Sequence, residues 1–205
     1  MAITSIVHDL RVVLLATILA GAPAAHACGY HDPSSVNLGL LNLAYPDALY
    51  VRTAVWEAQL DGALPRNEQP AVSSPETEKI RAMLRMRATV VRLGALRDRI
   101  GTAPDGHPAP AFSMVLIGPM LWTRFEDSGG TLQMDAHATG PAGEDVVIVT
   151  DEPVVAALLD GRITPQQARA RGLVRFYGAQ KSVEDVASLL DGAGPVKTTS
   201  AAGTR

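Results

Sequence analysis

The sequence predicts an α+β fold, in which a small, mostly antiparallel sheet carries packed helices and is preceded by a helical N-terminal region. Three observations predict it. A helix start at Ser74-Pro75 is followed by helical apolar spacing up to Gly101. Short apolar runs separated by turn residues follow over residues 112–149. Short helical patterns and one more strand then extend to residue 190, an order typical of α+β domains.

The first 27 residues are typical of a secretory signal peptide. Arg11 precedes an uncharged apolar run from Val12 to Ala22, Pro23 ends it, and Ala25-His26-Ala27 fits a small-x-small cleavage site. The run is shorter than the roughly 20 apolar residues that span a bilayer. We therefore expect cleavage after Ala27 and a periplasmic or secreted protein that begins at Cys28.

Composition argues against several classes of function. The chain has 18 basic and 21 acidic residues, so it lacks the basic excess of a general nucleic-acid binder. Cys28 is the only cysteine, which rules out an intrachain disulfide. The sequence contains neither a Gly-x-Ser-x-Gly elbow nor a phosphate loop, so we expect a protein that is not an enzyme and has no cofactor.

Residues 28–75 are predicted to be an N-terminal extension with one helix. Glycine and proline residues between Cys28 and Pro46 indicate a loop. Asp47 is then expected to cap a helix from Ala48 to Leu60. Residues 61–75 are predicted to form another loop.

Cys28 and His31 are a candidate metal site, since a thiol and an imidazole three residues apart are metal-ligand types. Copper or zinc would need a further ligand, which His107 or His137 could supply. A lipid anchor at Cys28 is an alternative, although the residues before it match a lipoprotein signal poorly. The other alternative is a flexible N-terminus without metal.

The helix predicted over residues 76–100 carries two stripes at helical spacing and is expected to be mostly buried. The apolar stripe contains Ile80, Leu84, Val91 and Ala95, widened by Met83, Met86, Val90 and Leu93. The narrower stripe contains Arg81, Arg85, Arg92 and Arg99. These arginines form either a solvated face or a contact with anionic lipid headgroups or an acidic partner.

The second half is predicted to hold five strands and three short helices. The strands are expected at residues 112–117, 120–125, 131–138, 146–149 and 172–177, and the helices at 152–159, 165–171 and 183–190. In the third strand Leu132, Met134 and Ala136 alternate with polar residues, which indicates one buried face. Ser182 and Asp185 indicate a capping box for the last helix. The acidic pairs at 126–127, 144–145 and 151–152 are expected to be solvated in turns, and residues 191–205 to be a disordered tail.

The segment from Val146 to Gly178, VVIVTDEPVVAALLDGRITPQQARARGLVRFYG, has a distinctive order. An apolar strand leads to an acidic helix start, paired leucines, Gly-Arg-Ile-x-Pro, a helix with alanine and Gly-x-apolar-x-apolar-x-Gly. It resembles the C-terminal half of sterol carrier protein domains, and the resemblance covers about residues 112–190. The matching positions are Asp151, Leu158, Leu159, Gly161, Arg162, Ile163, Pro165, Ala168, Gly172, Leu173, Val174, Phe176 and Gly178.

The resemblance implies a domain over residues 76–190, with helices packed on an open sheet, an apolar tunnel for a fatty or sterol-like ligand, and no catalytic residues. Eight apolar side chains could line the tunnel or simply fill the core. They are Met114, Met120, Trp122, Phe125, Met134, Leu158, Leu159 and Phe176.

These patterns together predict an exported, non-enzymatic binding protein for an apolar small molecule or lipid. The alternative is a periplasmic metal-binding or redox accessory protein that acts through Cys28 and His31. A third hypothesis is a structural partner of another exported protein, which docks through the N-terminal extension or the arginine stripe. Contact with a membrane surface is a further expectation for those arginines.

Overall fold

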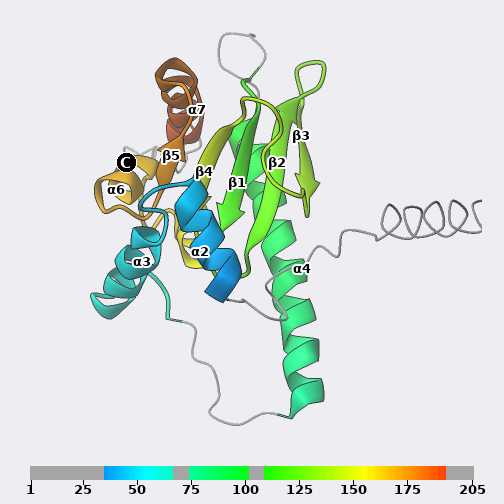
Figure 1. Cartoon of the computed structure of the whole chain (residues 1–205), viewed down its shortest axis with the longest axis vertical. Helices are drawn as coiled ribbons and strands as arrows, with labels where there is room; N and C mark the ends of the chain where they lie inside the picture. Colours follow the sequence, from blue (N-terminus) through cyan, green and yellow to red (C-terminus); the bar gives the residue numbers. More distant parts are fainter. Residues whose placement is uncertain (1–34, 67–73, 102–108, 193–205) are drawn as a thin grey trace, which may run out of the picture.

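The computed structural model of the chain describes residues 35–66, 74–101 and 109–192 (Figure 1). The predicted signal peptide, Cys28, His31 and His107 lie outside these ranges. In chain order the elements are α2 (Ser35–Ala44), α3 (Tyr50–Leu60), α4 (Pro75–Ile100), β1 (Phe112–Leu116), β2 (Leu121–Asp127), β3 (Leu132–Ala136), β4 (Val146–Thr150), α5 (Glu152–Leu159), α6 (Pro165–Ala170), β5 (Arg175–Tyr177) and α7 (Gln180–Gly192).

The five strands form one sheet in the order β3-β2-β1-β4-β5. β1 and β4 run parallel at its centre, whereas β1–β2, β2–β3 and β4–β5 are antiparallel pairs. All five residues of β1 and of β4 are buried, as expected for central strands covered on both sides. The predicted α+β class, with a mostly antiparallel sheet and a helical N-terminal region, is therefore confirmed.

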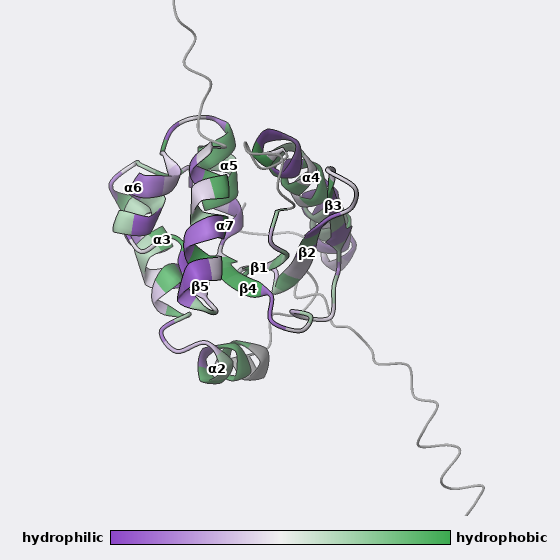
Figure 2. Cartoon of the chain, turned by 90° about the horizontal axis from the view of Figure 1, so that it is seen from above, coloured by the Kyte–Doolittle hydropathy of each residue, from purple (hydrophilic) through white to green (hydrophobic). Residues whose placement is uncertain are grey.

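The two faces of the sheet pack against different helices. Tyr45, just after α2, packs against Trp122 and Tyr177, with ring centroids 6.0 and 5.2 Å apart, so these strand residues mark the side that we call the α2 face. Figure 2 shows α2 on one side of the strands and α4 and α5 on the other. Phe112 and Phe125 are opposite one another on that second side, the α4 face, with stacked rings 4.7 Å apart.

Helix α4 begins and ends at the predicted residues. The Ser74 hydroxyl accepts a hydrogen bond from the Thr77 N–H at 3.3 Å, Pro75 occupies the first turn, and Gly101 ends the helix with a φ of +61°. Its expected burial is wrong, because most of the predicted apolar stripe faces solvent. Ile80, Met83, Leu84, Val91 and Ala95 are exposed, and Ala82, Thr89, Leu93, Leu96 and Ile100 are buried instead.

Residues 35–44 form helix α2, although this stretch was expected to be a loop. Gly39 does not prevent the helix, because a central glycine costs only about 1 kcal/mol relative to alanine, and burial of Leu41 in the core offsets it. Asp47 does not cap α3 as expected, since it lies in a turn with a φ of +68°. The N-cap residue is Leu49, whose N–H donates to the side chain of Asn42 at 3.2 Å.

The helices after the sheet follow the predicted order with one change of boundary. Asp151 caps α5, and Thr164 and Gln167 form a capping box at α6. Helix α7 begins at Gln180, so Ser182 lies inside it and does not serve as the expected cap. Of the helices in the described ranges, none has the length and hydropathy needed to cross a bilayer.

Candidate functional site

The eight predicted ligand residues all lie in or around one hydrophobic core. Met114 and Phe125 are buried members of that core. Met120, Trp122, Met134, Leu158, Leu159 and Phe176 are half-buried and pack against it. The structure therefore brings these residues together around the core, while their role as ligand residues stays a prediction.

Four of the eight share the α4 face of the sheet. Phe125 is opposite Met134 in the β2–β3 pair, and Met114 and Phe176 both flank Ile148 in β4. Met134 and Phe176 are half-buried, so solvent reaches this face at both outer strands.

The other four lie elsewhere. Trp122 is on the α2 face, and Met120 is in the turn between β1 and β2 with a φ of +50°. Leu158 and Leu159 belong to α5, which packs beside α4. A binding site on the α4 face would thus use α5 as a wall and would not include Trp122.

Thr123 is a polar residue in the middle of the apolar α4 face. It lies opposite Met114 on one side and Ala136 on the other, and its side chain is fully buried. Its hydroxyl has no hydrogen-bond partner among the residues that the structure describes. A buried polar group without a partner costs about 1–3 kcal/mol. The alternation of Leu121, Thr123 and Phe125 could have indicated an inward-facing hydroxyl, but the sequence prediction considered only apolar side chains.

Polar contacts fasten α4 to α5 beside this face. The buried Thr89 hydroxyl donates to the Glu152 carboxylate at the start of α5. The Arg99 guanidinium donates to the carbonyls of Leu158 and Leu159, at 3.0 and 2.7 Å, at the end of α5. Both ends of α5 are thereby fixed to α4, and one of the predicted stripe arginines has a structural role.

A separate groove of about 370 Å³ lies between the C-terminal end of α4 and the β2–β3 hairpin. Its lining is largely polar or glycine, and none of the eight predicted ligand residues contributes to it. The lining residues are Arg97, Asp98, Gly101, Gly130, Thr131, Leu132 and Gln133.

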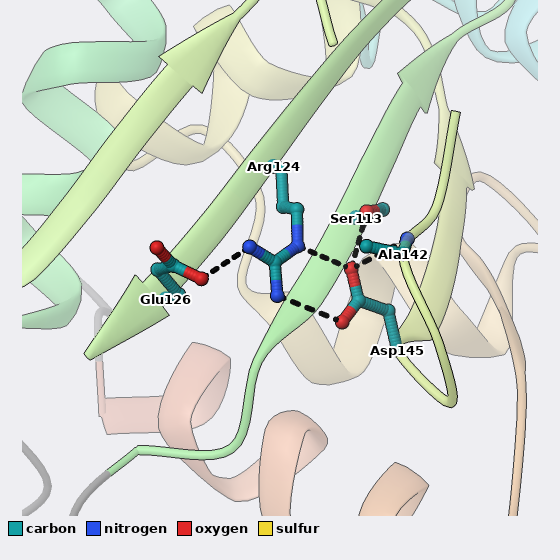
Figure 3. A network of polar contacts seen from close by, with 5 residues as sticks. All are labelled: Ser113, Arg124, Glu126, Ala142 and Asp145. Carbon is teal, nitrogen blue, oxygen red and sulfur yellow. Dashed lines mark hydrogen bonds and ion pairs between the residues drawn. The ribbon is translucent and has the colours of Figure 1, made fainter. Parts of the chain in front are cut away.

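The α2 face carries a polar network around the carboxylate of Asp145 (Figure 3). That carboxylate accepts hydrogen bonds from the Ser113 hydroxyl at 2.8 Å, from Arg124 Nε at 2.9 Å and from the Ala142 N–H at 3.2 Å. Arg124 also pairs with Glu126. The network ties the turn before β4 to β1 and β2.

Electrostatics at Asp145 follow from this network. Its side chain is only 4% exposed, and burial alone would raise its pKa. The hydrogen bonds from Arg124, Ser113 and Ala142 outweigh burial and lower the pKa below its ordinary value. Asp145 therefore stays ionised as a structural anchor, and the expectation that it is solvated is wrong.

Asp151 is a second carboxylate that is more buried than expected, at the carboxyl ends of the parallel strands β1 and β4. Burial raises its pKa, although hydrogen bonds from the Glu152 N–H at 2.8 Å and the Gly118 N–H at 3.1 Å act in the opposite direction. Gly118 permits this approach, because a Cβ there would lie 2.8 Å from Asp151 Oδ1.

Cys28 and His31, the predicted metal ligands, lie outside the described residues. His137 is exposed at the end of β3, with a φ of +73°. Within residues 35–66, 74–101 and 109–192, no three His, Cys, Asp or Glu side chains are grouped so that they could hold a metal ion.

No family model and no curated protein matches the chain. Among solved structures, a UbiJ-SCP2 ubiquinone synthesis protein is 15% identical over 54% of this chain and 98% of its own, with a TM-score of 0.38. The conserved hypothetical protein TT1886 from Thermus thermophilus, described as a sterol carrier protein candidate, is 16% identical over 54% of this chain and 84% of its own, with a TM-score of 0.28.

A third structure, the inverting sec-alkylsulfatase Pisa1 from Pseudomonas sp., is 18% identical over 46% of this chain, with a TM-score of 0.34. This chain spans only 14% of the length of that enzyme. The descriptions of two of these three structures thus refer to sterol carrier proteins. With identities below 20% and TM-scores below 0.5, the three likenesses do not assign the chain to a family.

Proposed function

We propose that this chain is an exported, non-enzymatic protein that binds an apolar small molecule or lipid carrying one polar group. The ligand would lie between the α4 face of the sheet and helices α4 and α5. The observation that supports this proposal is the hydroxyl of Thr123, which is buried on an apolar face and has no partner in the described ranges. Buried polar groups in native proteins nearly always have a partner, and a ligand hydroxyl or carboxyl group would provide one.

The surroundings of Thr123 suit an apolar ligand body. Met114 lies beside it in β1, and Met134 is on the same face in β3. Methionine side chains are unbranched and flexible, so they can rearrange around an irregular apolar molecule. Met134 is half-buried, so the ligand would enter the core beside this side chain. The resemblance of residues 146–178 to sterol carrier domains implies the same class of ligand.

Export is the second part of the proposal and rests on residues 1–27. Their apolar run and Ala25-His26-Ala27 ending match a secretory signal. The ligand site lies entirely after this segment, so the two parts of the proposal can be tested separately.

The test of binding uses the protein purified from an exporting host, with palmitic acid and cholesterol as probes. Native mass spectrometry should detect a bound apolar molecule, and at least one probe should raise the melting temperature. Thr123→Val keeps the side-chain shape but removes the hydroxyl, so it should weaken probe binding about tenfold. Thr123→Ser retains the hydroxyl and is the matched control.

Two outcomes would reject this site. A ligand-free mass spectrum together with unchanged melting temperatures for both probes would show that the core is simply packed. Probe binding by Thr123→Val at wild-type strength would show that the ligand head does not meet this hydroxyl.

A further inference from the structure

The side of α4 that faces solvent carries an apolar surface bordered by arginines, and we propose that it docks the protein on an anionic lipid surface. We call this surface the α4 patch. It consists of Ile80, Met83, Leu84 and Val91, which are 55–66% exposed. Ile80 is three residues before Met83 and four before Leu84, and Leu84 is seven before Val91. This spacing places them on one side of the helix.

The α4 patch points away from the rest of the domain. The buried side of α4 carries Thr89, Leu93 and Leu96, and its neighbours include α5, β3 and α7. In Figure 1 the N-terminal half of α4 extends beyond the end of the sheet. Among the described residues, no element covers the α4 patch, so an apolar strip about three turns long remains open to an external partner.

The charge on α4 is opposite to that of the chain as a whole. Helix α4 contains seven basic and three acidic residues, so its formal charge is +4, whereas the whole chain carries −3. Arg87 lies on the same side of the helix as the α4 patch, and Arg85 and Arg92 lie beside that surface. Within the described part of the chain, the side chains of these three arginines make neither an ion pair nor a hydrogen bond. The Arg81 side chain pairs with Glu78 of the same helix, at 3.4 Å.

A bilayer with anionic lipids matches both properties at once. Its headgroups pair with the arginines, and the boundary of its acyl chains accepts the apolar side chains. The aliphatic stem of Arg87 can lie along the apolar strip while its guanidinium reaches a headgroup. A second copy of this chain fits less well, because a contact between two α4 patches would bring together two helices with a charge of +4 each.

The experiment measures flotation of the protein purified from an exporting host, with two kinds of vesicle. One kind contains phosphatidylcholine alone, and the other also contains phosphatidylglycerol. We expect binding to the anionic vesicles only, with a decrease at high salt because added ions screen the arginines. The triple variant Arg85→Gln/Arg87→Gln/Arg92→Gln should bind at least about tenfold more weakly, because it removes three cations that would pair with anionic headgroups.

An apolar variant and two controls complete the design. Leu84→Ser/Val91→Ser should also bind at least about tenfold more weakly, because it removes the apolar contact. Leu43→Ser removes a leucine on α2 that is 80% exposed. Arg162→Gln/Lys181→Gln removes two exposed positive charges that lie outside α4. Both controls should bind as the wild type does.

The proposal is overturned by equal binding to both kinds of vesicle, or by wild-type binding of both α4 variants. A concentration-dependent dimer that the α4 variants dissociate, together with no vesicle binding, would instead assign the α4 patch to self-association. All the substituted side chains are on the surface, so circular dichroism is expected to show unchanged folding. They also lie outside the core that the ligand test addresses, so this result and that one are independent.

Discussion

Leu84 and Leu93 lie on opposite sides of α4. They are nine residues apart, which is two and a half helical turns. Leu93 is 0% exposed and belongs to the core, whereas Leu84 is 55% exposed and belongs to the α4 patch. Both leucines occur in the same predicted apolar stripe, yet only one of them packs against the domain.

Truncation of these two leucines should therefore have very different effects. Leu93→Ala leaves a cavity in the core and should lower the free energy of unfolding by about 2–5 kcal/mol. Leu84→Ala should change it by less than about 0.5–1 kcal/mol. Urea unfolding of both variants measures the difference, and equal losses would show that the assigned orientation of α4 is incorrect.

Thr123 and Thr150 are both fully buried on the α4 face. Among the described residues only the Thr150 hydroxyl has a partner, the carbonyl of Leu173 at 3.0 Å. Thr150→Val leaves that carbonyl without its donor and should lower the free energy of unfolding by about 1–3 kcal/mol. Thr123→Val removes a hydroxyl without a partner, so the ligand-free variant should be at least as stable as the wild type. Thermal unfolding of ligand-free proteins compares them, and a larger loss for Thr123→Val would contradict the assignment.

The network at Asp145 should contribute more stability than the exposed ion pair beside it. Asp145→Ala removes the acceptor for Ser113 and Arg124 and should lower the free energy of unfolding by about 2–4 kcal/mol. Glu126→Ala removes only a surface partner of Arg124 and should cost less than about 1 kcal/mol. Chemical unfolding at neutral pH separates the two.

The lowered pKa of Asp145 predicts that the stability of the protein depends on pH. The folded-state pKa of Asp145 is lowered, so its stabilisation is fully present above the ordinary aspartate value of about 3.9 and is lost as the pH falls through the folded pKa. The stability gap between wild type and Asp145→Ala should be constant from neutral pH down to about 4 and narrow below it. A gap that widens on acidification would contradict this.

Ionisation of Asp151 should lower the stability of the folded protein, whereas ionisation of Asp145 raises it. Its raised pKa means that the folded protein holds the proton more tightly than the unfolded chain, so the ionised form opposes folding above that pKa. Asp151→Asn keeps an oxygen that can accept from Gly118 and Glu152 without the charge. The variant should be at least as stable as the wild type at pH 7, and any advantage should shrink as the pH falls toward about 4. Lower stability of Asp151→Asn at pH 7 would contradict the prediction that the buried charge of Asp151 destabilises the folded protein.

Cleavage after Ala27 predicts a defined mature N-terminus. Intact mass of the protein purified from an exporting host should match a chain that begins at unmodified Cys28. A mass increase equal to a diacylglycerol and an acyl chain would indicate a lipid anchor. A mass that retains residues 1–27 would contradict export by this signal.

Much of the local structure could be predicted from neighbouring residues. Ser74-Pro75 and Gly101 mark the ends of α4 because their backbone preferences act locally. The alternation in β3 correctly predicts which side chains face inward, since the strand period is two. Helix α2 is not predictable in this way, because Gly39 and the neighbouring prolines are typical of a loop and the helix is stabilised by contacts of Leu41 with the core.

The candidate site was predictable only in part. The eight apolar residues do gather around one core, but their division between the two faces depends on strand pairing and could not be read from spacing. For the same reason, spacing does not reveal the buried position of the Thr123 hydroxyl or of the Asp145 carboxylate. The sequence does not distinguish a hydroxyl or carboxylate that is solvated from one that is buried with a partner or buried without one.

The sequence by itself determined the fold class, the order of the elements and the ends of α4, because periodicity and capping are properties of neighbouring residues. Only the tertiary structure decided which side of α4 faces the domain. Thr89 and Leu93 lie on the packed side because Thr89 meets Glu152 and Arg99 meets the end of α5, and these partners are about 60 residues away along the chain. That choice leaves Leu84 and its apolar neighbours open to solvent beside the arginines.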